Sequence, residues 1–170
     1  MQARYPQEII ESYLLDASKH EDNVAQPSSI SILKEYREAQ FIIYIVKYSD
    51  LDQQQIYACM IIRQTEVSAW EFAGFMMMGG VPSTDIPQKP PPQIAYVLFS
   101  SSHSSFTGVV VLPNEVQTTA IRLKDSQGFI ATSQLENNAA LFVTRQKLHK
   151  PLYLEMLDHE NGLLAQKRLA

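Results

Sequence analysis

The strongest constraint on the fold is a regular succession of short apolar runs in the second half of the chain. Seven such runs predict strands at 94–99, 107–112, 116–123, 128–133, 139–145, 152–157 and 163–168. They are separated by turns rich in Asp, Asn and Gly, residues that adopt the positive φ angles of tight turns. Apolar and polar residues alternate within the runs, which predicts sheets with one buried and one solvated face. We therefore expect an antiparallel sandwich or meander, immunoglobulin-like by strand count but without the Cys…Trp…Cys spacing of true immunoglobulin domains.

A helix is predicted at the start of the chain. Pro6 suits the first helical position, and Glu8 and Glu11 lie near the positive end of the helix dipole. A stripe of apolar residues follows at helical spacing, namely Ile9, Ile10, Tyr13, Leu14 and Ala17. The pattern predicts one amphipathic helix that ends near Lys19 and His20.

Three strands are predicted after this helix. The β-branched and aromatic run 41–48 predicts a strand whose middle is buried on both faces, paired with 56–63 in a hairpin. Residues 28–39 fit a helix or a strand, and we favour a strand at 30–36 that pairs ahead of the hairpin. Strand character is expected from 66 through Phe72, followed by irregular backbone.

Prolines divide the chain. Five of them fall within 81–93, where consecutive prolines remove backbone donors and favour an extended linker or loop. We expect an N-terminal part at 1–80, a Pro-rich connection at 81–93 and a sandwich-like part at 94–170, as two sub-domains or with one shared core. The fold class is predicted as α+β and mainly antiparallel β, with the N-terminal helix packed on a sheet.

Charge and cysteine content exclude several function classes. The net charge is −4, which argues against a nucleic-acid partner. Residues 1–85 hold 6 basic and 12 acidic residues (net −6), whereas 86–170 hold 8 and 6 (net +2). A single Cys forms no internal disulfide. Because no apolar run approaches the ~20 residues of a membrane span and no signal sequence is evident, we expect a soluble, cytoplasmic protein without a membrane partner.

An aromatic and methionine-rich stretch is the candidate binding site. Trp70, Phe72, Phe75 and Met77 precede Gly79 and Gly80, and such residues are typical of adaptable binding surfaces. Packing in the core of a sheet near its edge is the favoured interpretation of these residues, because large apolar side chains are usually buried. Cys59 lies in an apolar strand and is expected to be an inert buried thiol.

Two patterns with catalytic or metal-binding potential are weak. His103 lies among five serines at 100–105, but adjacent residues rarely form a triad and the nucleophile-elbow pattern is missing. His149 and His159 do not have the spacing of known metal sites, and Asp158 to Gly162 is better explained as a turn. No catalytic residue, metal ligand or cofactor is assigned.

Three hypotheses of function follow. The first is a non-catalytic interaction or adaptor module that binds a protein partner, or a second copy, through an exposed edge strand. The second is a small-molecule binding module with a pocket near Trp70 and the 74–93 loop. The third, and least favoured, is a hydrolase that uses His103 and a neighbouring Ser. An enzyme is thus the less favoured class.

Overall fold

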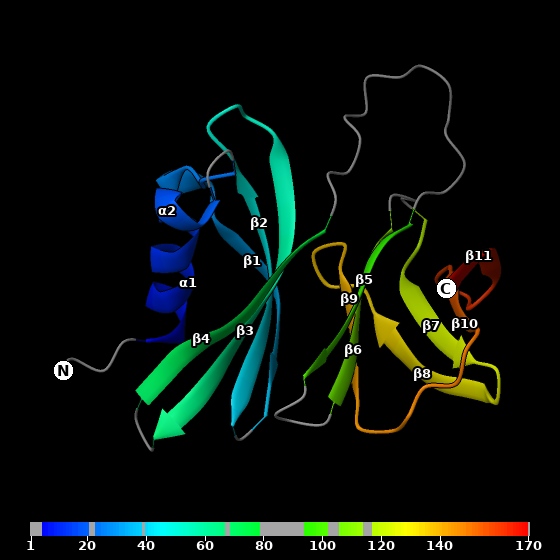
Figure 1. Ribbon diagram of the computed structural model, residues 1–170. Coiled ribbons are helices and arrows are strands. Elements are labelled where there is room, and N and C mark those ends of the chain that lie inside the picture. Colours follow the sequence, from blue (N-terminus) through cyan, green and yellow to red (C-terminus); the bar gives the residue numbers. More distant parts are fainter. Residues whose placement is uncertain are drawn as a thin grey trace. The chain divides into compact units, whose positions relative to one another are not determined.

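The computed structural model describes residues 5–20, 23–38, 40–66, 69–78, 94–101, 106–113 and 117–169. Its elements are mostly antiparallel strands with few helices, and the strands form several open sheets (Figure 1). The chain divides into two compact units, Met1–Pro82 and Ser83–Ala170. The expected Pro-rich connection 81–93 lies outside the described residues, so the domain boundaries stay a prediction.

The N-terminal unit begins with two short helices in place of the single predicted one. Helix α1 (Pro6–Leu14) has Pro in its first turn and buries Ile9, Ile10 and Leu14, as the apolar stripe predicts. Helix α2 (Ala17–His20) follows after a break. The break arises at Asp16, whose carboxylate accepts hydrogen bonds from the Ser18 amide (3.0 Å) and the Ser18 hydroxyl (2.6 Å). Such side-chain capping starts a new helix in place of continuing the old one.

In the described part of this unit, four antiparallel strands form a sheet in the order β1-β2-β3-β4. They are β1 (Ser31–Arg37), which follows the short 3-10 helix η1 (Pro27–Ser29), then β2 (Phe41–Ser49), β3 (Gln55–Glu66) and β4 (Ala69–Met78). The predicted hairpin and the strand ahead of it are confirmed. Residues 41–46 of β2 are buried on both faces, again as predicted.

The expectation of irregular backbone after Phe72 is wrong, because β4 continues to Met78. Its last residues pair with β3, for example Met76 with Cys59 and Met77 with Ala58. Pairing with a long neighbour thus overrides the weak strand preference of Gly74 and the methionines.

Among the described residues of the C-terminal unit, seven strands make up the sheets. They are β5 (Ile94–Ser101), β6 (Phe106–Pro113), β7 (Ala120–Asp125), β8 (Gly128–Gln134), β9 (Ala140–Thr144), β10 (Leu152–Leu157) and β11 (Leu163–Leu169). One sheet has the order β5-β6-β9 and the other β11-β10-β7-β8. All seven match predicted strands, although β7 starts at Ala120 and not at 116.

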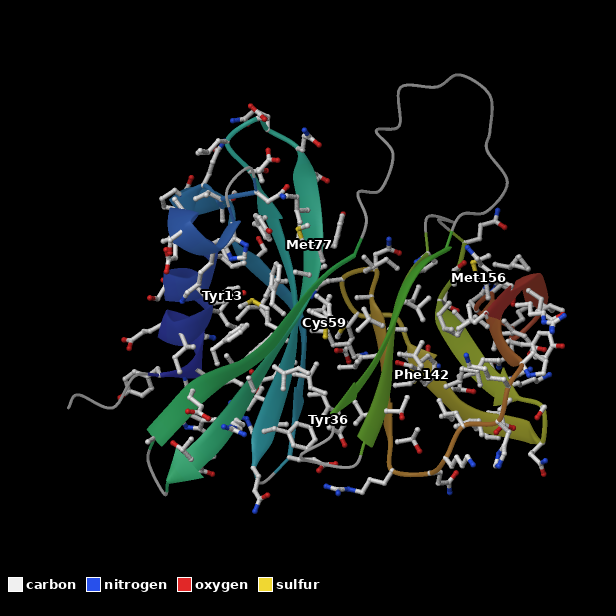
Figure 2. All side chains as sticks on the ribbon, viewed as in Figure 1. Tyr13, Tyr36, Cys59, Met77, Phe142 and Met156 are labelled. Carbon is white, nitrogen blue, oxygen red and sulfur yellow. The ribbon has the colours of Figure 1, made fainter. Side chains whose placement is uncertain are left out.

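One hydrophobic cluster joins the two sheets of this unit. It contains Val109 and Val111 of β6, Phe142 of β9, Leu123 of β7 and Met156 of β10, among others. Figure 2 labels Phe142 and Met156 among the side chains of this unit. The turn prediction is confirmed where Asn137, Asn138, Asn161 and Gly128 adopt positive φ.

Candidate binding surfaces

The four predicted binding residues lie on β4, an edge strand, and all face the helices. Trp70, Phe72, Phe75 and Met77 pair with Gln64, Ile62, Met60 and Ala58 of β3. The last three partners belong to the core cluster that includes residues of α1, and directly opposed residues share a face. A β-bulge at residue 73, where Ile61 pairs with Gly74 and Ile62 with Phe72, keeps Phe72 and Phe75 on that face despite their odd spacing.

Residues of the two helices contact these aromatic rings. Tyr13 stacks on Phe72, with ring centroids 3.9 Å apart and an interplanar angle of 11°, and lies 5.4 Å from the ring of Phe75. His20 meets Phe75 edge-on at 4.9 Å. Trp70, Phe72 and Phe75 pack partly buried against the core, whereas Met77 is 46% exposed. The helices therefore cover part of the predicted site, and its role in binding stays a prediction.

His20 is an unusual member of this cluster, because its ring is buried. Burial lowers the pKa of His20, opposed by a hydrogen bond with the Tyr13 backbone and by the charge of Asp16. Within the described part of the chain, its Nε2 atom has no hydrogen-bond partner. The neutral imidazole is thus the form that this environment favours.

Cys59 is fully buried on β3, as the sequence suggests. Burial raises the pKa of its thiol to about 12. A thiol that stays protonated and inaccessible is a poor nucleophile.

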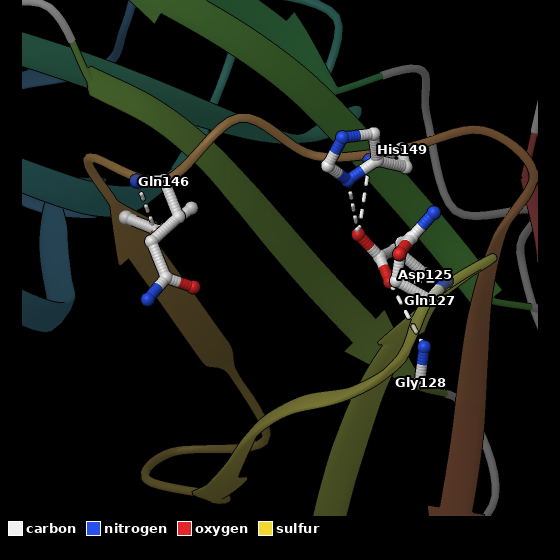
Figure 3. A network of polar contacts seen from close by, with 6 residues as sticks. Asp125, Gln127, Gly128, Gln146 and His149 are labelled. Atoms are coloured by element: carbon white, nitrogen blue, oxygen red, sulfur yellow. Dashed lines mark hydrogen bonds and ion pairs between the residues drawn. The ribbon is translucent and has the colours of Figure 1, made fainter.

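A buried carboxylate in the C-terminal unit ties a turn to a loop (Figure 3). Asp125, at the end of β7, accepts hydrogen bonds from the amides of Gln127 (2.8 Å) and Gly128 (3.1 Å) in the β7–β8 turn. Its other oxygen accepts from the His149 amide (3.0 Å) and lies 3.2 Å from His149 Nδ1. The hydrogen bond from the His149 amide is the largest effect that lowers the pKa of Asp125, despite burial.

The same contacts fix the loop between β9 and β10, whose His149 carbonyl also accepts a hydrogen bond from the Ser126 amide at 3.0 Å. We name residues 145–150 the basic loop, since it carries Arg145, Lys147 and Lys150 as well as His149, all with exposed side chains. Sequence reasoning missed this loop. The signal is three Lys or Arg residues within six positions, in a chain whose net charge is −4.

The sheet edges differ in charge. Strand β1 carries Lys34, Glu35 and Arg37, β4 carries Glu71, and β11 carries Lys167 and Arg168. Strand β8, with the sequence GFIATSQ, has no charged residue, and its Phe129 is 62% exposed. Strand β9 is uncharged as well, but its first three residues are buried. Strand β5, with the sequence IAYVLFSS, is a further uncharged edge. Charged side chains protect edge strands from pairing with other chains, so β8, with Phe129 exposed, is less protected than β1, β4 and β11.

The catalytic and metal-binding candidates that the sequence offers do not form a site among the described residues. His103 and the serines at 102, 104 and 105 lie outside the described residues, and Ser100 and Ser101 end β5. His149 is held by Asp125, whereas His159 lies 3.8 Å from Glu160 on an exposed turn. Among the described residues, no three His, Cys, Asp or Glu side chains gather as a metal ion would require.

Comparison with protein-family models, curated proteins and solved structures finds no match to this chain. None of the described helices has the length and apolar character needed to cross a membrane.

Proposed function

We propose that this protein is a non-catalytic protein-interaction module that binds an extended segment of a partner at the free edge of β8. The observation that carries the proposal is that β8 is an uncharged edge strand with an exposed aromatic side chain, Phe129. An added strand satisfies the unpaired backbone groups of such an edge, while alternate side chains supply specificity.

The topology of the C-terminal unit supports an immunoglobulin-like sandwich for 94–169. With β5 to β11 taken as consecutive strands, the first, second and fifth form one sheet. The third, sixth and seventh form the other, as in the immunoglobulin arrangement, and the fourth strand joins that second sheet at its edge. In this arrangement β8 is an edge by topology. Because fold alone does not define function, the proposal rests on the composition of that edge.

The charged edges β1, β4 and β11 are less suited to strand addition. Pairing β11 with a copy of itself would bring Lys167 and Arg168 of the two copies close together, and like charges on paired strands repel. Strand β8 itself presents no charged side chain to a strand paired with it. Phe129, which pairs with Lys124 of β7 and stays largely exposed, would gain a neighbour on the same face.

A peptide with the sequence of β8, residues 128–134, is a direct probe because it already forms an edge strand of this kind. We expect the addition of this peptide to slow amide hydrogen exchange in β8 and to shift its NMR resonances, with smaller changes in β1 and β11. The same peptide N-methylated at alternate amides should lose this effect, since it cannot donate the ladder hydrogen bonds.

On the protein side, Thr132→Lys places a charge at an exposed position of the edge and should weaken binding. Gln54→Lys, in the exposed β2–β3 turn, is the charge-matched control and should bind as the wild type does. Equal protection of all sheet edges, or equal binding of the N-methylated peptide, would refute the proposal.

A further inference from the structure

The basic loop lies directly beside the first residue of β8. The carboxylate of Asp125 accepts a hydrogen bond from the Gly128 amide at 3.1 Å and from the His149 amide at 3.0 Å. One carboxyl group thus bridges the start of β8 and the middle of the loop. This places Lys147 and Lys150 next to the end of the edge strand at which a bound segment would begin or finish.

The charges of Lys147 and Lys150 are not neutralised by the carboxylate that holds this loop in place. Asp125, the carboxylate that holds the loop, is buried, and its oxygens are occupied by amides of the turn and by His149. The side chains of Lys147 and Lys150 are exposed and form no ion pair with another described residue. The loop is therefore a cluster of cations on a fixed backbone, which suits an anionic partner.

The other end of the same unit has the opposite character. The connections at 135–139 and 158–162 hold Glu136, Asp158 and Glu160, and in those two connections no Lys or Arg occurs. Strand β8 runs from the basic end at Gly128 to the acidic end at Gln134. A segment lying along β8 therefore meets positive charge at one end and negative charge at the other, which gives the edge a polarity.

We propose that the partner of β8 is a protein segment with acidic residues at its C-terminal end, docked against the basic loop. This inference rests on the proposed function, because it names the partner for the same strand. Antiparallel pairs outnumber parallel ones, and an antiparallel segment ends beside Gly128. Two residues beyond that point extend it by about 6.6 Å, toward Lys147 and Lys150. Carboxylates there pair with the lysines, and the uncharged middle of the segment pairs with β8.

The test uses three peptides that share the β8 sequence and differ in two added residues. One carries Glu-Glu at its C-terminus, one carries Glu-Glu at its N-terminus, and one carries Gln-Gln at its C-terminus. We expect the first peptide to bind the wild type roughly fivefold more tightly than the third, the size expected of two exposed ion pairs. The second peptide should bind no more tightly than the third, since its acidic end lies at the acidic end of the unit.

Two protein variants locate the effect. Lys147→Gln with Lys150→Gln should remove the preference for the first peptide and leave the binding of the third unchanged. Lys167→Gln with Arg168→Gln on β11 removes the same charge at the far edge of the sheet and should keep the preference. Raising the salt concentration to about 0.5 M should also remove it, because exposed charges are then screened.

The two proposals fail in different ways. If all three peptides protect β8 and bind equally, the acidic partner is wrong and strand addition stands. If the first peptide binds tightly without protecting β8 amides, strand addition is wrong. A preference that survives Lys147→Gln with Lys150→Gln overturns the role of the basic loop.

Discussion

The stacking of Tyr13 on Phe72 couples helix α1 to the edge strand β4, and a double-mutant cycle can measure its strength. The perturbations are Tyr13→Leu, Phe72→Leu and the double variant, which keep an apolar side chain at both positions. The ring centroids are 3.9 Å apart and the planes nearly parallel. Aromatic pairs of this kind contribute about 0.5–1.5 kcal/mol beyond the burial of their surface.

We therefore expect the double variant to be about 1 kcal/mol more stable than the sum of the two single losses predicts. For a unit of this size the urea dependence is about 1–2 kcal/mol per molar, so the coupling corresponds to roughly 0.5–1 M in the unfolding midpoint. Urea unfolding followed by the fluorescence of Trp70 reports on this unit, since Trp70 lies on β4 and the chain has one Trp.

A second cycle that combines Tyr13→Leu with Phe41→Leu is the matched control. Phe41 pairs with Arg63, which places it on the opposite face of the sheet, so the two changes should add to within about 0.3 kcal/mol. A coupling below about 0.3 kcal/mol in the Tyr13–Phe72 cycle would show that the stack does not hold the helix to the strand.

Three further predictions concern single groups. Burial lowers the pKa of His20 below its ordinary 6.5, so the unfolded state takes up the proton first as the pH falls. The free energy of unfolding should therefore be at its full value above pH 6.5 and should decrease as the pH drops toward the folded-state pKa. His20→Gln should flatten this part of a plot of urea midpoint against pH, whereas His159→Gln, at an exposed site, should not. Burial raises the pKa of Glu155, but hydrogen bonds from Lys124 (2.6 Å) and Arg122 (3.1 Å) outweigh it and lower the pKa overall. In a denaturant titration at neutral pH, Glu155→Gln should thus lower the free energy of unfolding by about 2 kcal/mol. The control Glu160→Gln should lower it by less than about 0.5 kcal/mol. The difference between the two variants should shrink as the pH falls below 4.5 toward the lower folded-state pKa of Glu155. Cys59, with a buried thiol whose pKa is about 12, should react with a thiol-specific reagent only as fast as the N-terminal unit opens, and rapid labelling of the native protein would contradict its burial.

Local sequence predicted most strands because their signals are local. In β10, Leu152, Leu154 and Met156 are buried, as alternation requires. The turn at Asn161 adopts the positive φ that Asn tolerates. The pairing of strands that are not neighbours in sequence could not be predicted in the same way, because it joins residues far apart in the chain, such as Glu155 and Arg122.

The candidate surfaces show the same division. The residues Trp70, Phe72, Phe75 and Met77 stand out in the sequence, but a bulge at residue 73 decides which face they share, and Tyr13 decides what they contact. Conversely, the basic loop is visible as Arg145, Lys147 and Lys150, yet its position beside β8 depends on Asp125, which lies 24 positions before His149.

The sequence by itself determined the β-rich class, the alternating core faces, the turns and the inert cysteine, since each follows from residue type and short-range spacing. Tertiary structure alone decided that β4 extends to Met78 and that β8 is an edge strand beside a fixed cationic loop. These features depend on hydrogen bonds whose partners are chosen by the folded chain as a whole, and the proposed partner site is built from them.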